Sequence, residues 1–216
     1  MARQGYSKDI QNPKDISLEE RIERIIHTPK LELDGNAYKD KYDLNNENSI
    51  KKYLIINFRD NIINEDTGSK IRISNASAGK LAGHKGEIYR KSLAYISEII
   101  KHMKFLYETA PEKPNSSYQK YSYYITEASI DGNPYTILST VGKQNNEFYY
   151  DQNLFEGTNT AVFNAARNST DNKYSRLNKI LENVKESDWR QVPLRNELPP
   201  TTSTNNIINF PRKSKI

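Results

Sequence analysis

The sequence predicts an α+β fold, in which N-terminal helices and one long amphipathic helix pack on a four- to five-stranded, mainly antiparallel sheet. Two observations lead to this prediction. Apolar residues recur at helical spacing between residues 87 and 107, which is typical of a helix that packs on a sheet. Tyrosine-rich, β-prone segments follow between residues 116 and 151, and the Asp131-Gly132 pair among them is a strong signal for a tight hairpin.

The chain before residue 30 is predicted to contain one short helix. Residues 1–14 are polar and are expected to be disordered, whereas residues 15–29 are expected to form a helical arm. Ser17 is a good N-cap, and Glu20, three residues later, completes a capping box. Pro29 ends the helix, because the residue before a proline is disfavoured in helical geometry.

Residues 30–156 are predicted to form one α+β domain. The domain opens with a short strand or extended arm at 31–33, and apolar residues at helical spacing predict a helix over 45–60. Ile62-Ile63 and the alternating residues 70–74 then flank a glycine-containing turn, which predicts a hairpin.

The second half of this domain is predicted to hold a loop, the long helix and the main strands. Residues 75–86 are small, glycine-rich and basic, so we expect a flexible loop that leads into the helix over 87–107. Pro111 and Pro114 separate that helix from the sheet. An antiparallel meander is expected from three strands, at 116–130, 135–141 and 148–151.

Residues 157–216 are predicted to contain less regular structure than the domain before them. Residues 157–188 are expected to form a helical extension, with apolar positions on one side of a helix over 174–186. Residues 189–216 are rich in Pro, Thr, Asn and basic side chains, which is typical of a disordered tail. This tail, with Trp189 as an anchor, could dock on a protein partner.

Composition narrows the classes of function. The 216 residues carry 32 basic and 27 acidic side chains, so the net charge is +5, which fits either a polyanionic partner or an ordinary surplus of lysine. The chain contains no Cys, which excludes disulfides, thiolate metal sites and cysteine nucleophiles. No apolar run approaches the roughly 20 residues that a membrane span needs, and no secretory signal opens the chain. A cytoplasmic protein without membrane contact is expected.

The segment 79–86 is the first candidate for a functional site. Its glycines permit close approach of the backbone to a ligand, and Lys80, His84 and Lys85 supply positive charge in front of a helix. A phosphate could bind there, although a mobile surface loop with ordinary lysines explains the same residues. His84 also suits proton transfer, because an unperturbed imidazole titrates near neutral pH.

The aromatic strands are the second candidate. Tyrosines on a sheet beside basic residues can stack nucleic-acid bases, and Arg90 and Lys120 join Lys80 and Lys85 as candidate nucleic-acid contacts. Strands prefer aromatic residues for structural reasons as well, so the tyrosines alone do not distinguish a base-binding surface from an ordinary strand. Alternation cannot tell which sheet face packs against the long helix.

Two chemistries fit these parts. A metal-independent ribonuclease needs a base, a cation for the phosphorane and an acid, and candidates for these roles are Lys80, His84, Tyr124, Thr140 and Tyr150. A non-enzymatic module that binds nucleic acid or protein needs only the basic loop and the sheet, and a scaffold or toxin-neutralising partner is a third hypothesis. No metal site is apparent with three His and no Cys, and no cofactor is expected.

Several short stretches resemble the third type of large polyvalent protein-associated domain. They are residues 64–74, the continuation through Lys80 into a helix, residues 130–135 and residues 148–151, and the resemblance covers about residues 30–155. The resemblance implies a protein of phages, plasmids or integrative elements. The layout is also similar, more distantly, to phage nuclease domains of the barnase–EndoU–colicin–RelE type, which implies action on nucleic acid, with RNA preferred to DNA.

Overall fold

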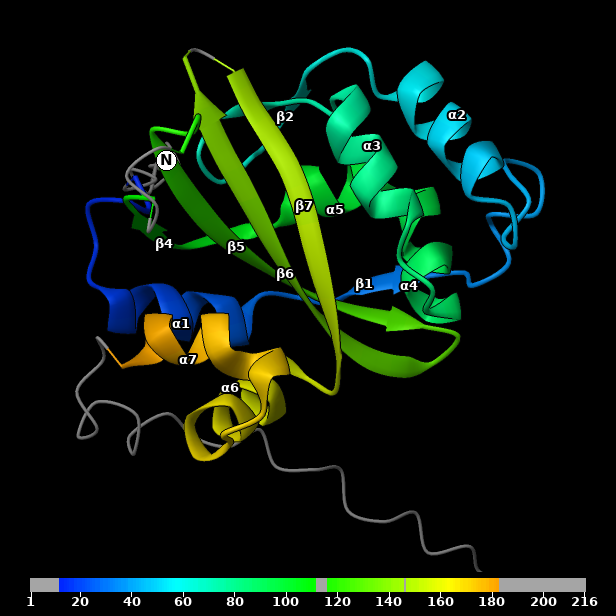
Figure 1. Ribbon diagram of the computed structural model, residues 1–216. Coiled ribbons are helices and arrows are strands. Elements are labelled where there is room, and N and C mark those ends of the chain that lie inside the picture. The colour runs from blue at the N-terminus through cyan, green and yellow to red at the C-terminus, as the bar shows by residue number, and fades with distance from the viewer. Residues whose placement is uncertain (1–11, 112–115, 146, 183–216) are drawn as a thin grey trace, which may run out of the picture.

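A four-stranded antiparallel meander forms the centre of the molecule. The computed structural model describes residues 12–111, 116–145 and 147–182 (Figure 1). Its consecutive strands pair in chain order: β4 (Lys104–Thr109), β5 (Lys120–Ile130), β6 (Asn133–Gln144) and β7 (Glu147–Glu156). The short strand β1 (Leu31–Leu33) pairs in parallel with the end of β5, on the edge that β4 also occupies. The predicted α+β class with a mainly antiparallel sheet is therefore confirmed.

The hairpin signals in the sequence are confirmed. Asp131 and Gly132 have φ angles of 52° and 81° between β5 and β6, as a two-residue turn of this kind requires. The hairpin of β2 (Ile62–Ile63) and β3 (Lys70–Ile71) also forms, and Arg72 behind it makes a parallel bridge to Tyr149 at the free edge of β7.

The predicted continuous helix over 87–107 is wrong. The segment forms α4 (Glu87–Ser92), a 3₁₀ turn (Leu93–Tyr95) and α5 (Ile96–His102), after which β4 begins at Lys104. The Asn64 side chain ends the helical stretch, because its amide donates to the carbonyls of Ile100 and Met103, both at 2.8 Å. The last apolar residues of the predicted stripe are buried on a strand, which helical periodicity cannot distinguish from a helix.

The predicted flexible loop over 75–86 is for the most part a helix. Residues Asn75–Ala82 form α3, which begins at the N-cap Ser74, whose hydroxyl accepts from the amide of Ser77 at 3.0 Å. Only the four residues 83–86 connect α3 to α4. Ser74 is a favourable N-cap residue, but Asn75, Ser77 and Gly79 are weak helix formers, so local propensity favours a loop here.

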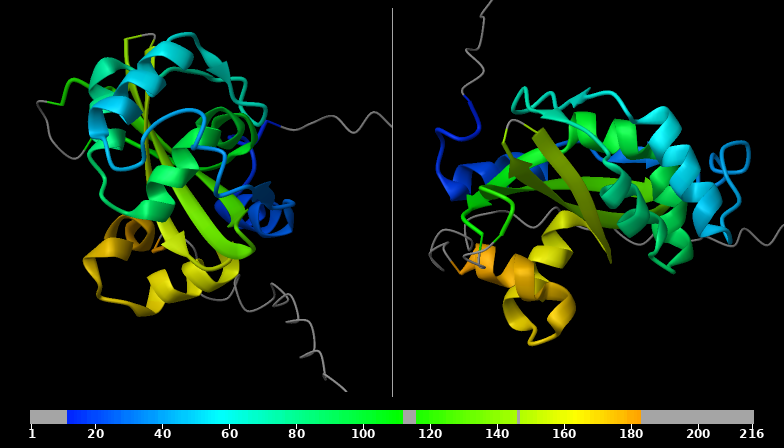
Figure 2. Two further views of the ribbon diagram at one scale, coloured as in Figure 1. Left: turned by 90° about the vertical axis from the view of Figure 1, so that its right-hand side faces the viewer. Right: turned by 45° about the horizontal axis from the view of Figure 1, so that its top comes forward.

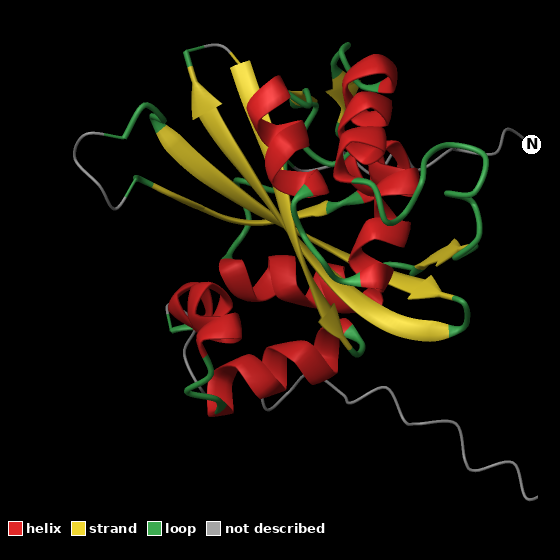
Figure 3. Ribbon diagram, turned by 45° about the vertical axis from the view of Figure 1, so that its right-hand side comes forward, coloured by secondary structure: helices red, strands yellow, loops and turns green. Residues whose placement is uncertain are grey.

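Helices cover both faces of the sheet (Figures 2 and 3). On one face, α3, α4, α5 and α2 (Glu47–Asn57) enclose a core that includes Tyr124 and Tyr150. On the other face, α1 (Leu18–His27), α6 (Asn159–Asn168) and α7 (Ser175–Leu181) pack on Tyr123 and Phe155. The capping box that the sequence predicts at the start of α1 is present, whereas α6 was not predicted. The predicted tail over 189–216 and residues 1–11 of the predicted disordered N-terminus lie outside the described residues.

Candidate functional site

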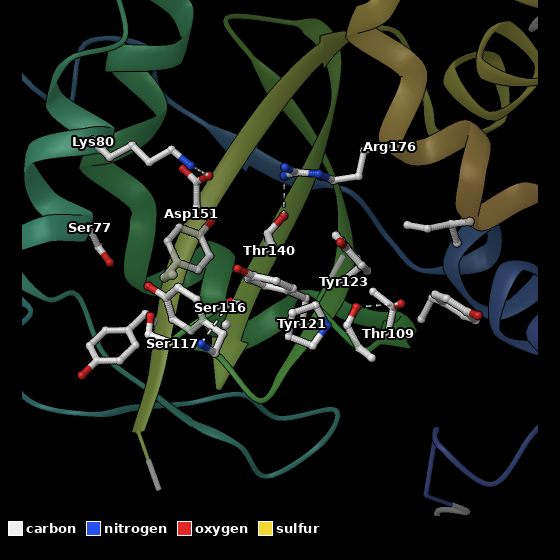
Figure 4. Close-up of a pocket in the computed structure, with 18 of the residues that line it drawn as sticks. Ser77, Lys80, Thr109, Ser116, Ser117, Tyr121, Tyr123, Thr140, Asp151 and Arg176 are labelled. Carbon is white, nitrogen blue, oxygen red and sulfur yellow. Dashed lines mark hydrogen bonds and ion pairs between the residues drawn. The ribbon is translucent and has the colours of Figure 1, made fainter. Parts of the chain in front are cut away.

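A cleft of about 870 Å³ opens over one face of the meander, between α3 and α7 (Figure 4). Strands β5, β6 and β7 form its floor, and residues Pro111 and Ser116–Tyr118, near the start of β5, form one end. Its lining is rich in hydroxyl groups and contains three basic side chains, Lys80, Arg176 and Lys179. Asp151 is the only carboxylate among the described residues that line it.

Strand register brings the floor residues together. Tyr123, Thr140 and Asp151 are direct neighbours across β5, β6 and β7. Tyr121, Gly142 and Tyr149 form the next such row, two residues along each strand. Since side chains two residues apart share a face of a strand, both rows point into the same cleft.

The first polar contact of the cleft joins Lys80 to Asp151. The Lys80 ammonium group, on α3, donates to Oδ2 of Asp151 and forms an ion pair with it. The Asp151 side chain is 17% exposed, and its Oδ1 atom is buried without a hydrogen-bond partner among the described residues. On the floor of the cleft, Asp151 thus pairs through Oδ2 with Lys80 and keeps Oδ1 buried, an exception to the rule that buried acceptors are paired.

The second polar contact joins Arg176 to Thr140. The Arg176 guanidinium, on the exposed side of α7, donates to Oγ1 of Thr140 at 3.2 Å. Within the described part of the chain, Arg176 pairs with no carboxylate. Lys179 lies almost one helical turn further along α7 and lines the same cleft. Among the described residues that line the cleft, Lys80, Arg176 and Lys179 are basic and Asp151 alone is acidic, and a basic lining favours an anionic ligand.

Three tyrosine rings gather at one end of the cleft. The Tyr118 ring lies 5.3 Å from that of Tyr121 and 5.9 Å from that of Tyr149, measured between ring centroids. Tyr118 packs directly on Gly142, where an added Cβ would lie 2.7 Å from its Cδ1 atom. Burial raises the pKa of Tyr118, so its hydroxyl stays neutral in the physiological range. These rings provide flat apolar surface beside the basic groups.

Of the candidate catalytic residues, Lys80, Thr140 and Tyr150 line this cleft, but the Tyr150 hydroxyl points into the core. It lies 3.0 Å from Ser139 Oγ and donates to Gln152 Oε1 at 2.7 Å, in a side chain that is 1% exposed. Tyr124 is equally buried on the face opposite the cleft, where its hydroxyl lies 3.3 Å from Thr67 Oγ1. Burial raises the pKa of both tyrosines.

His84 lies in a different cleft from Lys80. Its ring stacks on Tyr89, with centroids 4.2 Å apart, and lines a second cleft of about 690 Å³. Lys85 next to it is exposed and lines neither cleft. The prediction that Lys80 and His84 lie in one loop is therefore wrong, because Lys80 lies on α3 and His84 follows the end of that helix.

Arg90 and Lys120 make contacts within the protein. Arg90 is 8% exposed and donates to the carbonyls of Leu44 at 2.8 Å and of Ala82 at 3.3 Å, so it joins three segments of the chain. Lys120 forms an ion pair with Glu108 at 2.7 Å, between β5 and β4. Neither residue lines the main cleft.

Sequence reasoning missed Asp151 and Arg176, although they make both polar contacts of the cleft. Alternation along β7 would have placed Asp151 on the same face as Tyr149. Nothing in the sequence around Arg176 indicates which strand α7 approaches, so the position of Arg176 in the cleft could not be predicted.

In the described residues, no group of three or more His, Asp or Glu is placed to hold a metal ion. None of the helices described there is long and apolar enough to cross a membrane.

Comparison with known proteins identifies one family. Residues 39–150, about half of the chain, match large polyvalent protein-associated domain 3. The match includes α2 to α5, the meander up to Tyr150 and part of the cleft floor, but neither α6 nor α7. No curated protein and no solved structure shows significant similarity to the chain.

Proposed function

This chain belongs to the large polyvalent protein-associated domain 3 family, and from that premise we propose that it binds single-stranded nucleic acid, preferably RNA, in the cleft between α3 and α7. The family suggests a protein associated with mobile genetic elements. The cleft residues support the nucleic-acid part of the proposal.

The combination of three cations with tyrosine rings carries this proposal. Single strands bind where a basic groove follows the phosphates and aromatic rings stack on the bases, and each stacked base contributes roughly 1–3 kcal/mol. Arg176 and Lys179 offer positive charge on one wall, Lys80 offers it on the other, and Tyr118 lies between Tyr121 and Tyr149 at one end. A duplex would not expose its bases to such rings.

Hydroxyl and carboxylate groups favour RNA over DNA. Thr140 Oγ1 lies on the floor, and the Asp151 carboxylate, in a side chain that is 17% exposed, lines the same cleft. A ribose 2′-hydroxyl can donate to such acceptors, whereas deoxyribose has no equivalent group.

A binding titration tests the proposal. Fluorescent single-stranded RNA, single-stranded DNA and duplex RNA of one sequence are titrated with the protein at several salt concentrations. We expect the tightest binding for single-stranded RNA, and Arg176→Ala should weaken it at least several-fold. The control Lys52→Ala changes an exposed lysine on α2, outside the cleft, and should bind like the wild type. Equal affinities of Arg176→Ala and wild type would contradict the proposal.

Cleavage of the bound RNA is a second candidate function, and Asp151 is the residue that favours it. A carboxylate beside Lys80, opposite Arg176 and Thr140, has the groups that transesterification needs: a base for the 2′-hydroxyl and cations for the phosphorane charge. The 2′-oxygen would bond to phosphorus, the bond to the 5′-oxygen would break, and a 2′,3′-cyclic phosphate would remain. The proton from the 2′-hydroxyl would go to Asp151, and Lys80 would protonate the leaving oxygen.

Incubation with RNA in EDTA separates binding from cleavage. Under the nuclease hypothesis, the wild type releases cyclic-phosphate ends and Asp151→Asn does not. His84→Ala still cleaves a short RNA that fills only the first cleft, because His84 lies in the other cleft. Loss of activity in His84→Ala would instead favour the role that the sequence suggested for that histidine. If RNA stays intact while it binds with steep salt dependence, the chain is a non-enzymatic module.

A further inference from the structure

One face of β7 continues from the first cleft into the second. Tyr149 and Asp151 line the cleft of about 870 Å³, and Asn153 and Phe155 line the cleft of about 690 Å³. These four residues alternate along one strand, so their side chains point to the same face. From Tyr149 to Phe155 this row extends about 20 Å, at roughly 3.3 Å per residue.

The walls of the two clefts are continuous as well. On one side, Lys80 of α3 lines the first cleft, and His84 and Tyr89, which follow it in the chain, line the second. On the other side, Tyr174 lines the second cleft, and Arg176 lines the first. Figure 1 shows the same arrangement, with α3 and α4 on one side of β7 and α7 on the other.

The second cleft is lined by two stacked aromatic pairs. His84 stacks on Tyr89 with an angle of 21° between the rings, and Phe155 stacks on Tyr174 at 5.4 Å with an angle of 14°. The Lys173 ammonium lies 4.8 Å from the centroid of the Tyr174 ring. Planar ligands bind between or beside such rings. Lys173 adds positive charge to this lining, whereas Glu87 and Glu156 add negative charge, so the cleft suits a neutral planar group such as a nucleobase better than a phosphate.

Asn153 supplies an uncharged polar group on the β7 side of the second cleft, whose lining also holds Glu87 and Glu156. Its side chain is half-buried in the lining, and its amide makes no hydrogen bond within the described residues. An amide presents a donor and an acceptor side by side, which matches the edge of a nucleobase.

We infer that the two clefts form one groove along β7, in which a single strand of RNA places one nucleobase in the second cleft. This inference rests on the proposed function of the first cleft. The base packs against the half-buried rings of His84 and Tyr174, Asn153 hydrogen-bonds to its edge, and the phosphates pass between Lys80 and Arg176. Affinity therefore increases with the length of the strand until both clefts are occupied.

Binding of a trinucleotide and of an octanucleotide RNA to three variants tests the inference. Tyr174→Leu keeps apolar packing on Phe155 but removes the stacking ring, and Asn153→Ala removes the amide. We expect each to weaken octanucleotide binding roughly 5- to 100-fold, as the loss of one stacked or hydrogen-bonded base would. Trinucleotides that fill only the first cleft should bind both variants like the wild type, while Arg176→Ala should weaken both RNAs.

The outcomes separate this inference from the function on which it rests. If Arg176→Ala weakens RNA binding while Tyr174→Leu and Asn153→Ala do not, RNA binds in the first cleft alone. That result would overturn the continuous groove but not the proposed function. If the wild type binds no RNA, both fail. Photocrosslinking gives a second readout that needs no variant: 4-thiouridine at one end of the octanucleotide should label Tyr174 or His84. Labelling confined to the region of Tyr118 would overturn the groove.

Discussion

Thr140 and Asp151 lie directly opposite each other on β6 and β7, and each contacts a basic side chain from a different helix. Lys80 reaches Asp151 from α3, and Arg176 reaches Thr140 from α7. The two cations therefore approach one small area of the sheet from both sides. An anion that bound there would interact with both, and this relationship is the basis of the first prediction.

Lys80→Gln should lower the salt dependence of RNA binding. The logarithm of the affinity of single strands falls with the logarithm of salt concentration by about 0.7 for each neutralised phosphate, so the slope should decrease by about 0.7. Titrations at four salt concentrations measure it, with Lys52→Gln as the control outside the cleft. An unchanged slope would mean that Lys80 pairs only with Asp151 and contacts no phosphate.

Gly142→Ala should displace Tyr118, because the new Cβ would lie 2.7 Å from the Tyr118 ring. If Tyr118 stacks on a base, Gly142→Ala and Tyr118→Ala should each weaken RNA binding. The double variant should lose no more than Tyr118→Ala alone, since both changes remove the same contact. Additive losses in this double-mutant cycle would contradict the coupling.

Arg90→Met should destabilise the fold without a direct effect on the main cleft. The guanidinium donates to the carbonyls of His84, Leu44 and Ala82, and methionine keeps the bulk but leaves these groups unpaired. The free energy of unfolding should fall by about 3 kcal/mol. Urea unfolding measures it, and Lys85→Met, an exposed neighbour, should stay within about 0.5 kcal/mol of the wild type.

Glu108→Gln should reduce stability at neutral pH and have less effect in acid. Burial alone raises the pKa of Glu108, but hydrogen bonds from Lys120 and Ser122 and the nearby Lys14 outweigh burial, so the pKa lies below 4.5. A carboxyl with a lowered pKa in the folded state stabilises it above the unfolded pKa, and this stabilisation is lost as the pH falls through the folded pKa.

Urea unfolding at neutral pH and at several pH values below 4.5 checks this window. The difference in the free energy of unfolding between Glu108→Gln and the wild type should become smaller as the pH falls. The control Glu98→Gln changes an exposed glutamate on α5 that has no ion pair among the described residues, and its difference should not follow the same course. A pH-independent difference for Glu108→Gln would show that the carboxylate is not responsible.

Much of the fold followed from local signals in the sequence. The capping box at Ser17 and Glu20, the hairpin turn at Asp131 and Gly132, and the order of the meander strands were all predicted and are confirmed. Each depends on residues close together in the chain, so backbone preferences and short hydrogen bonds suffice to define it.

The tertiary structure alone decided how the segment between residues 75 and 109 divides. Asn64 lies 36 residues before Ile100 in the sequence, and it ends α5 at His102 by binding the carbonyls of Ile100 and Met103. Pairing with β5 makes residues 104–109 a strand. No local pattern contains this information, because a buried apolar residue looks alike in a helix and in a strand.

The tertiary structure also decided the candidate site. The sequence determined that Lys80 and His84 are basic, that tyrosines follow on strands and that the chain would form an α+β fold. It did not determine that Lys80 joins Asp151 and approaches Arg176, while His84 stacks on Tyr89 in the neighbouring cleft. Where a side chain points depends on where its helix ends and on which strand that helix contacts, and long-range packing sets both.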